Sequence, residues 1–202
     1  MIIITEIKKA KKNYIVSLSD GRSLSLLPDT VFHFSLSDGQ EIDETQLREI
    51  MIFNDETAAN EAAAAFVSYS DRTEKQLRDK LAAKGFDRAV IDRTVMKFKE
   101  YEYINDEEYA RRFSTELAVK FGPKVIRAKL LQRGISGEMA SRFAKDASED
   151  QERSARQLVE KLQYKYRELP AYEKKRKLYT TLMQKGYEWG AVSHLIKTDD
   201  ED

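Results

Sequence analysis

Hydrophobic residues in the first part of the chain gather in two short runs that favour β-strands. The runs are IIITEI (residues 2–7) and YIVSLSDGRSLSLL (residues 14–27). The second run contains Asp20-Gly21 between its apolar segments, which is a strong signal for a two-residue hairpin turn. We therefore expect a small β unit of about three strands over residues 1–53, too small to be stable without packing on its neighbour.

From about residue 54 the hydrophobic pattern becomes that of helices, and it repeats. Three segments share apolar residues four positions apart, followed by a basic residue, a glycine and another apolar residue. These segments are LRDKLAAKGF (77–86), IRAKLLQRGI (126–135) and LYTTLMQKGY (178–187). Their glycines, Gly85, Gly134 and Gly186, are 49 and 52 residues apart. A basic residue followed by glycine is typical of a helix C-terminus, because glycine adopts the left-handed conformation without a side-chain penalty.

Helix-start signals place further helices around each of these segments. A longer helix is expected to begin near Asp55 or Thr57 in the first unit, at Asn105 in the second, and at Ser148 in the third, where Ser148 and Gln151 match a capping box. Pro123 and Pro170 suit the first turn of the glycine-ended helices. Asp43 with Gln46 predicts a short helix at the end of the β unit.

The pattern therefore predicts a mainly α protein with a small N-terminal β-hairpin unit. Three tandem three-helix repeats would stack into an elongated curved rod, because no repeat alone could bury its apolar face well. The expected domains are 1–53 for the β unit, 54–104 and 105–147 for the first two repeats, and 148–202 for the third repeat with an acidic tail. The third helix of the second repeat is expected to be short.

The acidic run Asp106-Glu107-Glu108 could be a metal site or the first turn of a helix. Asn105 is a favoured N-cap, Glu108 stands where a capping box needs its carboxylate, and Ile104 and Tyr109 are placed as a hydrophobic staple. Negative charge in the first turn also favours the exposed N–H groups. A hard cation would need further oxygen ligands from a second acidic motif, which the sequence does not supply. We interpret the run as a helix start, with no metal and no cofactor.

Composition narrows the class of protein. The 202-residue chain has no cysteine, so disulfides, thiol catalysis and cysteine-bound metals are excluded. No apolar run approaches the length of a membrane span, and the N-terminus lacks the pattern of a signal peptide. These features predict a cytoplasmic protein, which we expect to be a monomer without membrane contact.

A formal net charge of zero hides a segregation of charge along the chain. Residues 1–110 carry 15 Lys and Arg against 21 Asp and Glu, a net of −6, whereas residues 111–197 carry 20 against 10, a net of +10. The acidic tail supplies the remaining −4. A basic C-terminal half points to an anionic partner, although runs of charge often serve only to solvate a helical surface. The candidate binding residues are Arg111, Arg112, Lys120, Lys124, Arg127, Lys129, Arg133, Lys174, Lys175 and Arg176, with Lys177 beside them.

The inventory for catalysis is poor. The two histidines, His33 and His194, lie in different segments, and His33 stands between two phenylalanines, where a packed structural role is favoured. The sequence contains no Gly-x-Ser-x-Gly elbow and no glycine-rich phosphate loop. We expect no enzyme activity.

Several motifs follow one another in a fixed order along the helical part of the chain. They are Arg72-Thr73-Glu74 with Leu77, Leu81 and Lys84-Gly85-Phe86, then Tyr103-Ile104-Asn105-Asp106-Glu107-Glu108-Tyr109-Ala110, then Gly122 and Leu130-x-x-Arg133-Gly134-Ile135. In their order and spacing these motifs resemble the RecX family of bacterial regulators. Tyr109 stands where phenylalanine is more usual in this family, which keeps an aromatic ring. The resemblance covers roughly residues 55–197, and Leu36-x-x-Gly39-x-Glu41-Ile42 resembles the extension found on many members from Gram-positive bacteria.

This resemblance implies a function that the residue pattern alone does not reach. RecX proteins are built from three three-helix repeats and lie in the groove of the RecA–DNA filament. They inhibit ATP hydrolysis, strand exchange and the co-protease activity of RecA, by blocking filament growth or promoting disassembly, and so act in recombination, DNA repair and the SOS response. Some members also bind DNA directly. The alternative function is therefore a helical-repeat protein that acts on single- or double-stranded DNA without RecA.

Overall fold

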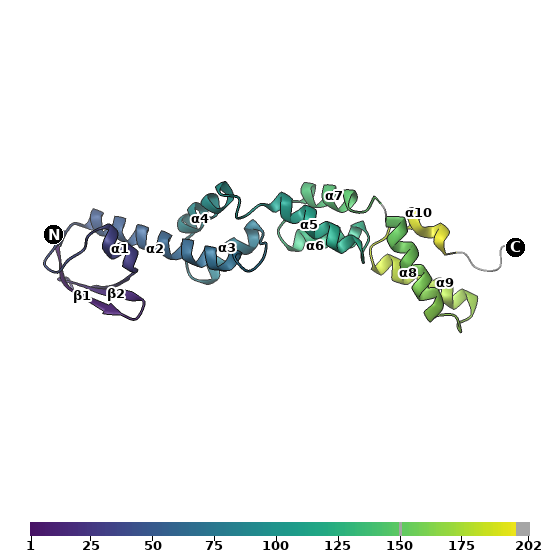
Figure 1. Cartoon of the computed structure of the whole chain (residues 1–202), viewed down its shortest axis with the longest axis horizontal. Coiled ribbons are helices and arrows are strands. Elements are labelled where there is room, and N and C mark those ends of the chain that lie inside the picture. The colour runs from purple at the N-terminus through teal and green to yellow at the C-terminus, as the bar shows by residue number, and fades with distance from the viewer. Residues whose placement is uncertain (150, 197–202) are drawn as a thin grey trace. The chain divides into compact units, whose positions relative to one another are not determined.

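The N-terminal residues form an antiparallel sheet covered by helices. The computed structural model describes residues 1–149 and 151–196 (Figure 1). Its sheet has the strand order β3-β2-β1-β4. The strands are β1 (Ile2–Ala10), β2 (Asn13–Leu18), β3 (Ser23–Leu26) and β4 (Glu41–Ile42), with the short helix α1 (Pro28–His33) before β4. The predicted β unit is confirmed, but its described residues form four strands, because β4 is a two-residue pairing with Ile2 and Ile3 that has no periodic signal.

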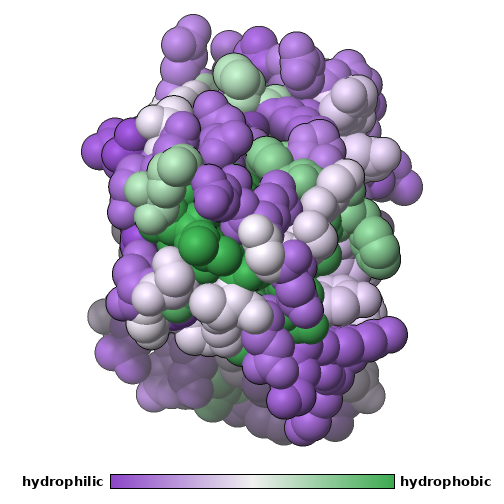
Figure 2. All heavy atoms as spheres, turned by 90° about the vertical axis from the view of Figure 1, so that its left-hand side faces the viewer, coloured by the Kyte–Doolittle hydropathy of each residue, from purple (hydrophilic) through white to green (hydrophobic). Residues whose placement is uncertain are grey.

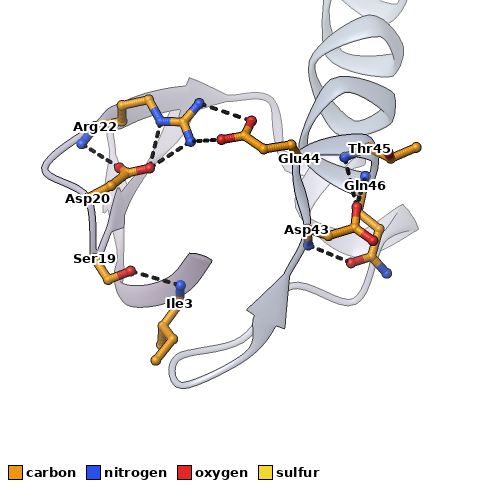
Figure 3. A network of polar contacts seen from close by, with 8 residues as sticks. All are labelled: Ile3, Ser19, Asp20, Arg22, Asp43, Glu44, Thr45 and Gln46. Atoms are coloured by element: carbon orange, nitrogen blue, oxygen red, sulfur yellow. Dashed lines mark hydrogen bonds and ion pairs between the residues drawn. The ribbon is translucent and has the colours of Figure 1, made fainter. Parts of the chain in front are cut away.

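The hairpin between β2 and β3 differs from its prediction by one residue. The amide of Leu18 donates to the carbonyl of Arg22 at 2.9 Å, so the loop holds three residues, and Gly21 takes the positive φ of 87°. A three-residue loop that ends in a left-handed glycine is the next most common hairpin after the two-residue turns. The Arg22 guanidinium donates to Asp20 at 2.6 Å and to Glu44 at 2.8 Å, which ties this loop to the start of α2 (Figure 3). The hydrogen bond from Arg22 lowers the pKa of the exposed Asp20 carboxyl.

Helix α2 (Glu44–Val67) has the predicted start, but its length differs from the prediction. Asp43 accepts hydrogen bonds from the amides of Thr45 and Gln46, and the Gln46 side chain accepts from the Asp43 amide in return, so the predicted capping box is present (Figure 3). The helix it opens is not short. It has 24 residues in all and continues through Asp55 and Thr57, near which the start of a separate helix was expected. No glycine or proline interrupts residues 44–67, so nothing in the backbone stops the helix there.

The long helix α2 contributes to two hydrophobic cores. Leu47 and Ile50 lie in the core of the β unit, whereas Ala59 and Ala63 lie in the core of the first repeat. The first repeat also contains α3 (Glu74–Ala83) and α4 (Arg88–Glu100). The composition of the chain shifts from β-formers to alanines within α2. This shift marks the point where the helix passes from one hydrophobic core to the next, and not the start of a helix.

The second and third repeats each have their own core. The second repeat comprises α5 (Asp106–Ala118), α6 (Pro123–Gln132) and α7 (Gly137–Asp146). The third comprises α8 (Gln151–Lys165), α9 (Ala171–Gln184) and α10 (Trp189–Val192), which a 3₁₀ turn (Ser193–Leu195) follows. The third helix of the second repeat, α7, has 10 residues against 13 in α4, and α10 of the third repeat is shorter still with 4 residues. The fold class of three tandem three-helix repeats with a small β unit is confirmed.

The three predicted glycine stops are confirmed in detail. Gly85, Gly134 and Gly186 have φ values of 87°, 89° and 84°. In each turn the glycine amide donates to a carbonyl three residues back, and the amide after it donates to one five residues back, as in Phe86 to Leu81. This pair of bonds defines the Schellman motif, which satisfies the last carbonyls of the helix. The basic residues before the glycines therefore stand at true helix ends.

Two of these glycine turns are covered by the start of another helix. The carbonyl of Arg133 accepts from the hydroxyl of Thr73 at 2.6 Å. In the same way, the Lys185 carbonyl accepts from the amide of Gly122 at 2.8 Å, and the Gly186 carbonyl accepts from the amide of Lys124 at 3.2 Å. The N-termini of α3 and α6 thus pack on the C-terminal turns of α6 and α9. Accordingly residues 72–76 belong to the same compact unit as the second and third repeats, and residues 1–71 and 77–104 form the other unit.

The helix predicted to begin at Ser148 begins three residues later. Helix α8 begins at Gln151, and Ser148 lies before it as a buried residue with 5% exposure. Neither Ser148 Oγ nor Gln151 Oε1 has a hydrogen-bond partner in the described structure, so the capping box is not formed. The backbone amide of Gln151 instead donates to the Ser148 carbonyl at 2.9 Å.

Candidate partner-binding surface

The acidic run that opens α5 is used by the fold itself. Asn105 Oδ1 accepts from the amide of Glu108 at 3.0 Å, which confirms the predicted N-cap. Asp106 accepts from the amide of Glu74 at 2.8 Å, and Glu107 pairs with Arg142 at 2.6 Å. Glu108 does not return a bond to Asn105 in the described structure; its carboxylate pairs with arginines one turn later.

The hydrophobic staple predicted beside this cap is not formed. Ile104 is buried in the core of the first repeat, whereas Tyr109 is buried in the core of the second. The residue pattern identified the helix start correctly, but it could not say to which core each flanking side chain belongs.

The basic residues of α5 and of the following loop differ in how far they are neutralised. Arg111 and Arg112 are exposed and both pair with Glu108, the second at 3.4 Å. Lys120 is exposed in the loop between α5 and α6 and has no ion pair with any acid in the described residues. Of these three cations, Lys120 therefore offers the most accessible charge.

Helix α6 presents its cations in two ways. Lys124 and Arg127 are exposed and three residues apart, so they share one face, and Arg127 Nε donates to Ser141 Oγ at 2.8 Å. Lys129 is half-buried with its ammonium 5.1 Å from the centre of the Phe121 ring. Arg133 is exposed with its guanidinium 5.4 Å from the centre of the Phe113 ring. Such contacts fix a cation over a ring without neutralising its charge.

Helix α9 carries the remaining candidates. Lys175, Arg176 and Lys177 are exposed and Lys174 is half-buried. A hollow of about 360 Å³ lies beside them and is lined by Tyr166, Arg176, Lys177, Thr180 and Thr181. Lys177 also lies 5.4 Å from the centre of the Tyr166 ring. The candidates on α9 thus form a cluster that includes an aromatic side chain.

Exposed aromatic residues accompany these cations in the third repeat. The side chains of Tyr164 and Tyr172 are 73% and 74% exposed, and Arg167 lies 4.9 Å from the centre of the Tyr164 ring. Tyr179 and Trp189 pack edge to face at 5.0 Å. Tyr164 and Tyr172 are therefore surface residues and do not belong to the core of the third repeat.

Neither histidine has a catalytic setting. His33 is exposed and stacks on Phe53 with ring centres 4.2 Å apart, so it packs on an aromatic residue without being buried. His194 Nε2 lies 3.2 Å from Glu152, and this contact, with a second from Arg156, lowers the pKa of the Glu152 carboxyl.

Burial raises the pKa of the Tyr187 hydroxyl, whose oxygen has no hydrogen-bond partner in the described residues.

The N-terminal unit offers a different kind of surface. Figure 2 shows hydrophobic side chains gathered on the face that this unit turns to the viewer, with polar residues around them. Within the β unit (residues 1–53), the large apolar residues that are most exposed are Met1, Phe32, Ile52 and Ile3. No described helix of the protein is long and apolar enough to cross a membrane.

Family models match all three helical repeats of the chain. The first, second and third three-helix domains of RecX match residues 59–98, 105–144 and 149–196, which together exceed half of the chain. The chain belongs to the RecX family. The resemblance drawn from its motifs is thereby confirmed.

RecX relatives match almost the whole chain, including the β unit. The regulatory protein RecX of Streptococcus gordonii is 32% identical over 209 residues, which cover 98% of this chain and 79% of the relative. The regulatory protein RecX of Streptococcus pneumoniae is also 32% identical, over 98% of this chain and 77% of the relative.

Two crystal structures are similar in fold. One, of a regulatory protein RecX, has a TM-score of 0.71 with 24% identity and covers 96% of this chain and 98% of its own, which supports the fold alone. The other, of RecX from Lactobacillus salivarius, has a TM-score of 0.66 with 27% identity and covers 70% of this chain and 94% of its own.

Proposed function

We propose that this protein binds the RecA–DNA filament and inhibits RecA, lowering its ATP hydrolysis, strand exchange and co-protease activity by blocking filament growth or promoting disassembly. Membership in the RecX family of regulatory proteins supports this proposal most directly. The protein acts as a regulator and not as an enzyme, and it works in the cytoplasm as a monomer.

The contact surface in this proposal is the basic half of the chain. Residues 111–197 carry a net charge of +10, and a nucleoprotein filament presents phosphates and acidic side chains. The exposed cations without a described ion pair, such as Lys120, Lys124 and Lys175, contribute more than Arg111 and Arg112, which Glu108 already neutralises in part. The full surface comprises Arg111, Arg112, Lys120, Lys124, Arg127, Lys129, Arg133, Lys174, Lys175 and Arg176.

Direct binding to DNA is the second candidate, and exposed aromatic residues favour it. Tyr164 and Tyr172 lie on helices that also carry lysines and arginines, and aromatic rings beside cations can stack on the bases of single strands. This function needs no RecA.

A co-sedimentation experiment separates the two functions. The protein is mixed either with RecA filaments on single-stranded DNA or with the same DNA alone, at matched salt. The proposal predicts that far more protein sediments with filaments than with naked DNA, and that this fraction falls steeply as salt rises. Equal binding to both would favour the DNA-binding function, and no excess with filaments at any salt would refute the RecA proposal.

A further inference from the structure

A cavity between the second and third repeats collects positive charge. Its volume is about 480 Å³, and α6 contributes Lys124 and Arg127 to its lining, while α7 contributes Lys145. None of these three cations forms an ion pair with an acid in the described residues. The cavity lies within one compact unit of the protein, which holds both repeats.

The remaining charges of the lining bring its net charge close to +1. Glu149 and Glu188 face the same cavity and offset two of the three cations. The guanidinium of Arg127 is oriented by the hydrogen bond from its Nε to Ser141, which leaves its two terminal nitrogens to donate elsewhere. A ligand with a single negative charge would therefore balance the cavity.

A buried polar side chain at the same cavity has no partner. Ser148 lines the cavity, is 5% exposed, and its Oγ makes no hydrogen bond in the described structure. The amide oxygen of Gln151, also in the lining, is buried without a partner as well, but it accepts hydrogen bonds and would need a donor, which an anion does not supply. Leaving a buried polar atom unpaired costs free energy, so such groups in a native protein normally meet a partner from outside the chain.

We propose that this cavity binds a phosphodiester group of a nucleic-acid backbone. Phosphate oxygens accept hydrogen bonds, and Ser148, Arg127, Lys124 and Lys145 supply donors from three separate segments. A carboxylate carries the same single charge on two oxygens, so the competition with polyglutamate described below distinguishes the two groups. The single charge of a phosphodiester matches the net +1 of the lining better than the double charge of a free or terminal phosphate does.

This inference rests on the proposed function in one respect: the proposed partner, the RecA–DNA filament, contains a nucleic-acid backbone. It adds Lys145 and Ser148, which the sequence pattern did not identify as binding residues, to Lys124 and Arg127, which it did. The hydroxyl of Ser148 is available to a ligand because it does not cap α8, the role that the sequence predicted for it.

The test measures binding of a short fluorescent single-stranded oligonucleotide to the full-length protein by anisotropy. Ser148→Ala removes the hydroxyl, Lys145→Gln removes one lining charge, and Lys161→Gln is the control, because Lys161 is exposed on α8 outside the cavity. We expect Ser148→Ala to weaken binding about three- to tenfold and Lys145→Gln to weaken it at least as much, with little change for Lys161→Gln. The melting temperature of Ser148→Ala should stay the same or rise, since its hydroxyl has no partner within the protein.

Competition identifies the source of the ligand group. An excess of unlabelled oligonucleotide should displace the probe, whereas a methylphosphonate oligonucleotide without backbone charge, inorganic phosphate and polyglutamate should displace it poorly. Three results would overturn the proposal: an equal loss of affinity in Lys161→Gln, unchanged affinity in Ser148→Ala, or stronger displacement by polyglutamate or inorganic phosphate. Since RecA is absent from this assay, a failure of the cavity leaves the RecA proposal standing, and a failure to inhibit RecA leaves the cavity result unaffected.

Discussion

At the scale of single residues, the three glycine turns have the same backbone but different surroundings. A side chain at Gly85 would meet no atom of the described structure within 4 Å, so only the left-handed backbone opposes it. A side chain at Gly186 would lie 2.5 Å from the backbone nitrogen of Val125 and would press on the start of α6. One at Gly134 would collide with the side chain of Lys75. The same residue type thus ends a helix at all three positions and allows close packing at two of them.

These surroundings predict different effects of alanine. Gly85→Ala should reduce the free energy of unfolding by about 1–2 kcal/mol, the usual penalty for a left-handed residue with a side chain. Gly186→Ala should reduce it by about 2–5 kcal/mol, because overpacking adds to that penalty. Urea unfolding followed by far-ultraviolet circular dichroism measures both. A smaller effect at Gly186 than at Gly85 would contradict the packing described above.

The cap of α5 gives a second prediction at this scale. Asn105→Ala should lower the free energy of unfolding by about 1 kcal/mol, since the side chain accepts from the amide of Glu108. Glu107→Ala is the control and should cost less, because its pair with Arg142 is exposed. If magnesium raised the melting temperature and a change at Asp106 abolished that rise, the acidic run would be a metal site after all.

At the scale of elements, the start of one glycine-ended helix covers the end of the next. Thr73 and Gln76 exchange hydrogen bonds at the start of α3, and the Thr73 hydroxyl also donates to the Arg133 carbonyl at the end of α6. Gly122 repeats this role between α6 and α9 through its amide. The equivalent position before α9 is Pro170, which has no amide hydrogen and cannot donate this bond.

Removal of the Thr73 hydroxyl tests this link between helices. Thr73→Val keeps the shape of the side chain but removes, at a fully buried site, both the donor to the Arg133 carbonyl and the acceptor for the Gln76 amide. We expect a loss of about 1–3 kcal/mol in the free energy of unfolding. Thr115→Val is a matched control, because its hydroxyl is exposed and bonds only within α5. Equal effects of the two substitutions would show that the Thr73 contact contributes nothing specific.

Some elements could be predicted from the sequence and others could not, for physical reasons. Glycine stops and the Asn105 cap depend on bonds within a few residues, so local patterns identify them. The continuity of α2 was missed because its two halves bury residues in different cores, which looks like a boundary in composition. Ser148 matches a capping pattern, yet the fold buries it beside a cavity whose other walls come from α6, α7 and the third repeat. No periodicity within one helix indicates which residues of neighbouring helices meet.

At the scale of the whole molecule, acidic and basic residues are concentrated in different parts of the chain. Residues 1–110 are acidic and residues 111–197 are basic, although the formal net charge is zero. The domain boundaries at 53/54, 104/105 and 147/148 stay predictions, and the first of them falls inside α2. Of the candidate contact residues, Lys129 and Arg133 also hold positions over aromatic rings, so their reversal would disturb packing as well as charge. Lys120, Arg127 and Lys175 are the better probes, since all three are exposed and without a described ion pair.

The most direct test of the account is DNA-dependent ATP hydrolysis by RecA from the same organism, measured with increasing amounts of this protein. The wild type should lower the rate, and the triple variant Lys120→Glu, Arg127→Glu and Lys175→Glu should need about tenfold or more protein for the same inhibition, because each reversal weakens contact with an anionic filament. The control reverses the exposed Lys9, Lys84 and Lys97 in the acidic half and should inhibit as the wild type does. Undiminished inhibition by a folded triple variant would contradict the assigned surface, and no inhibition by the wild type would contradict the proposal that this RecX protein restrains RecA.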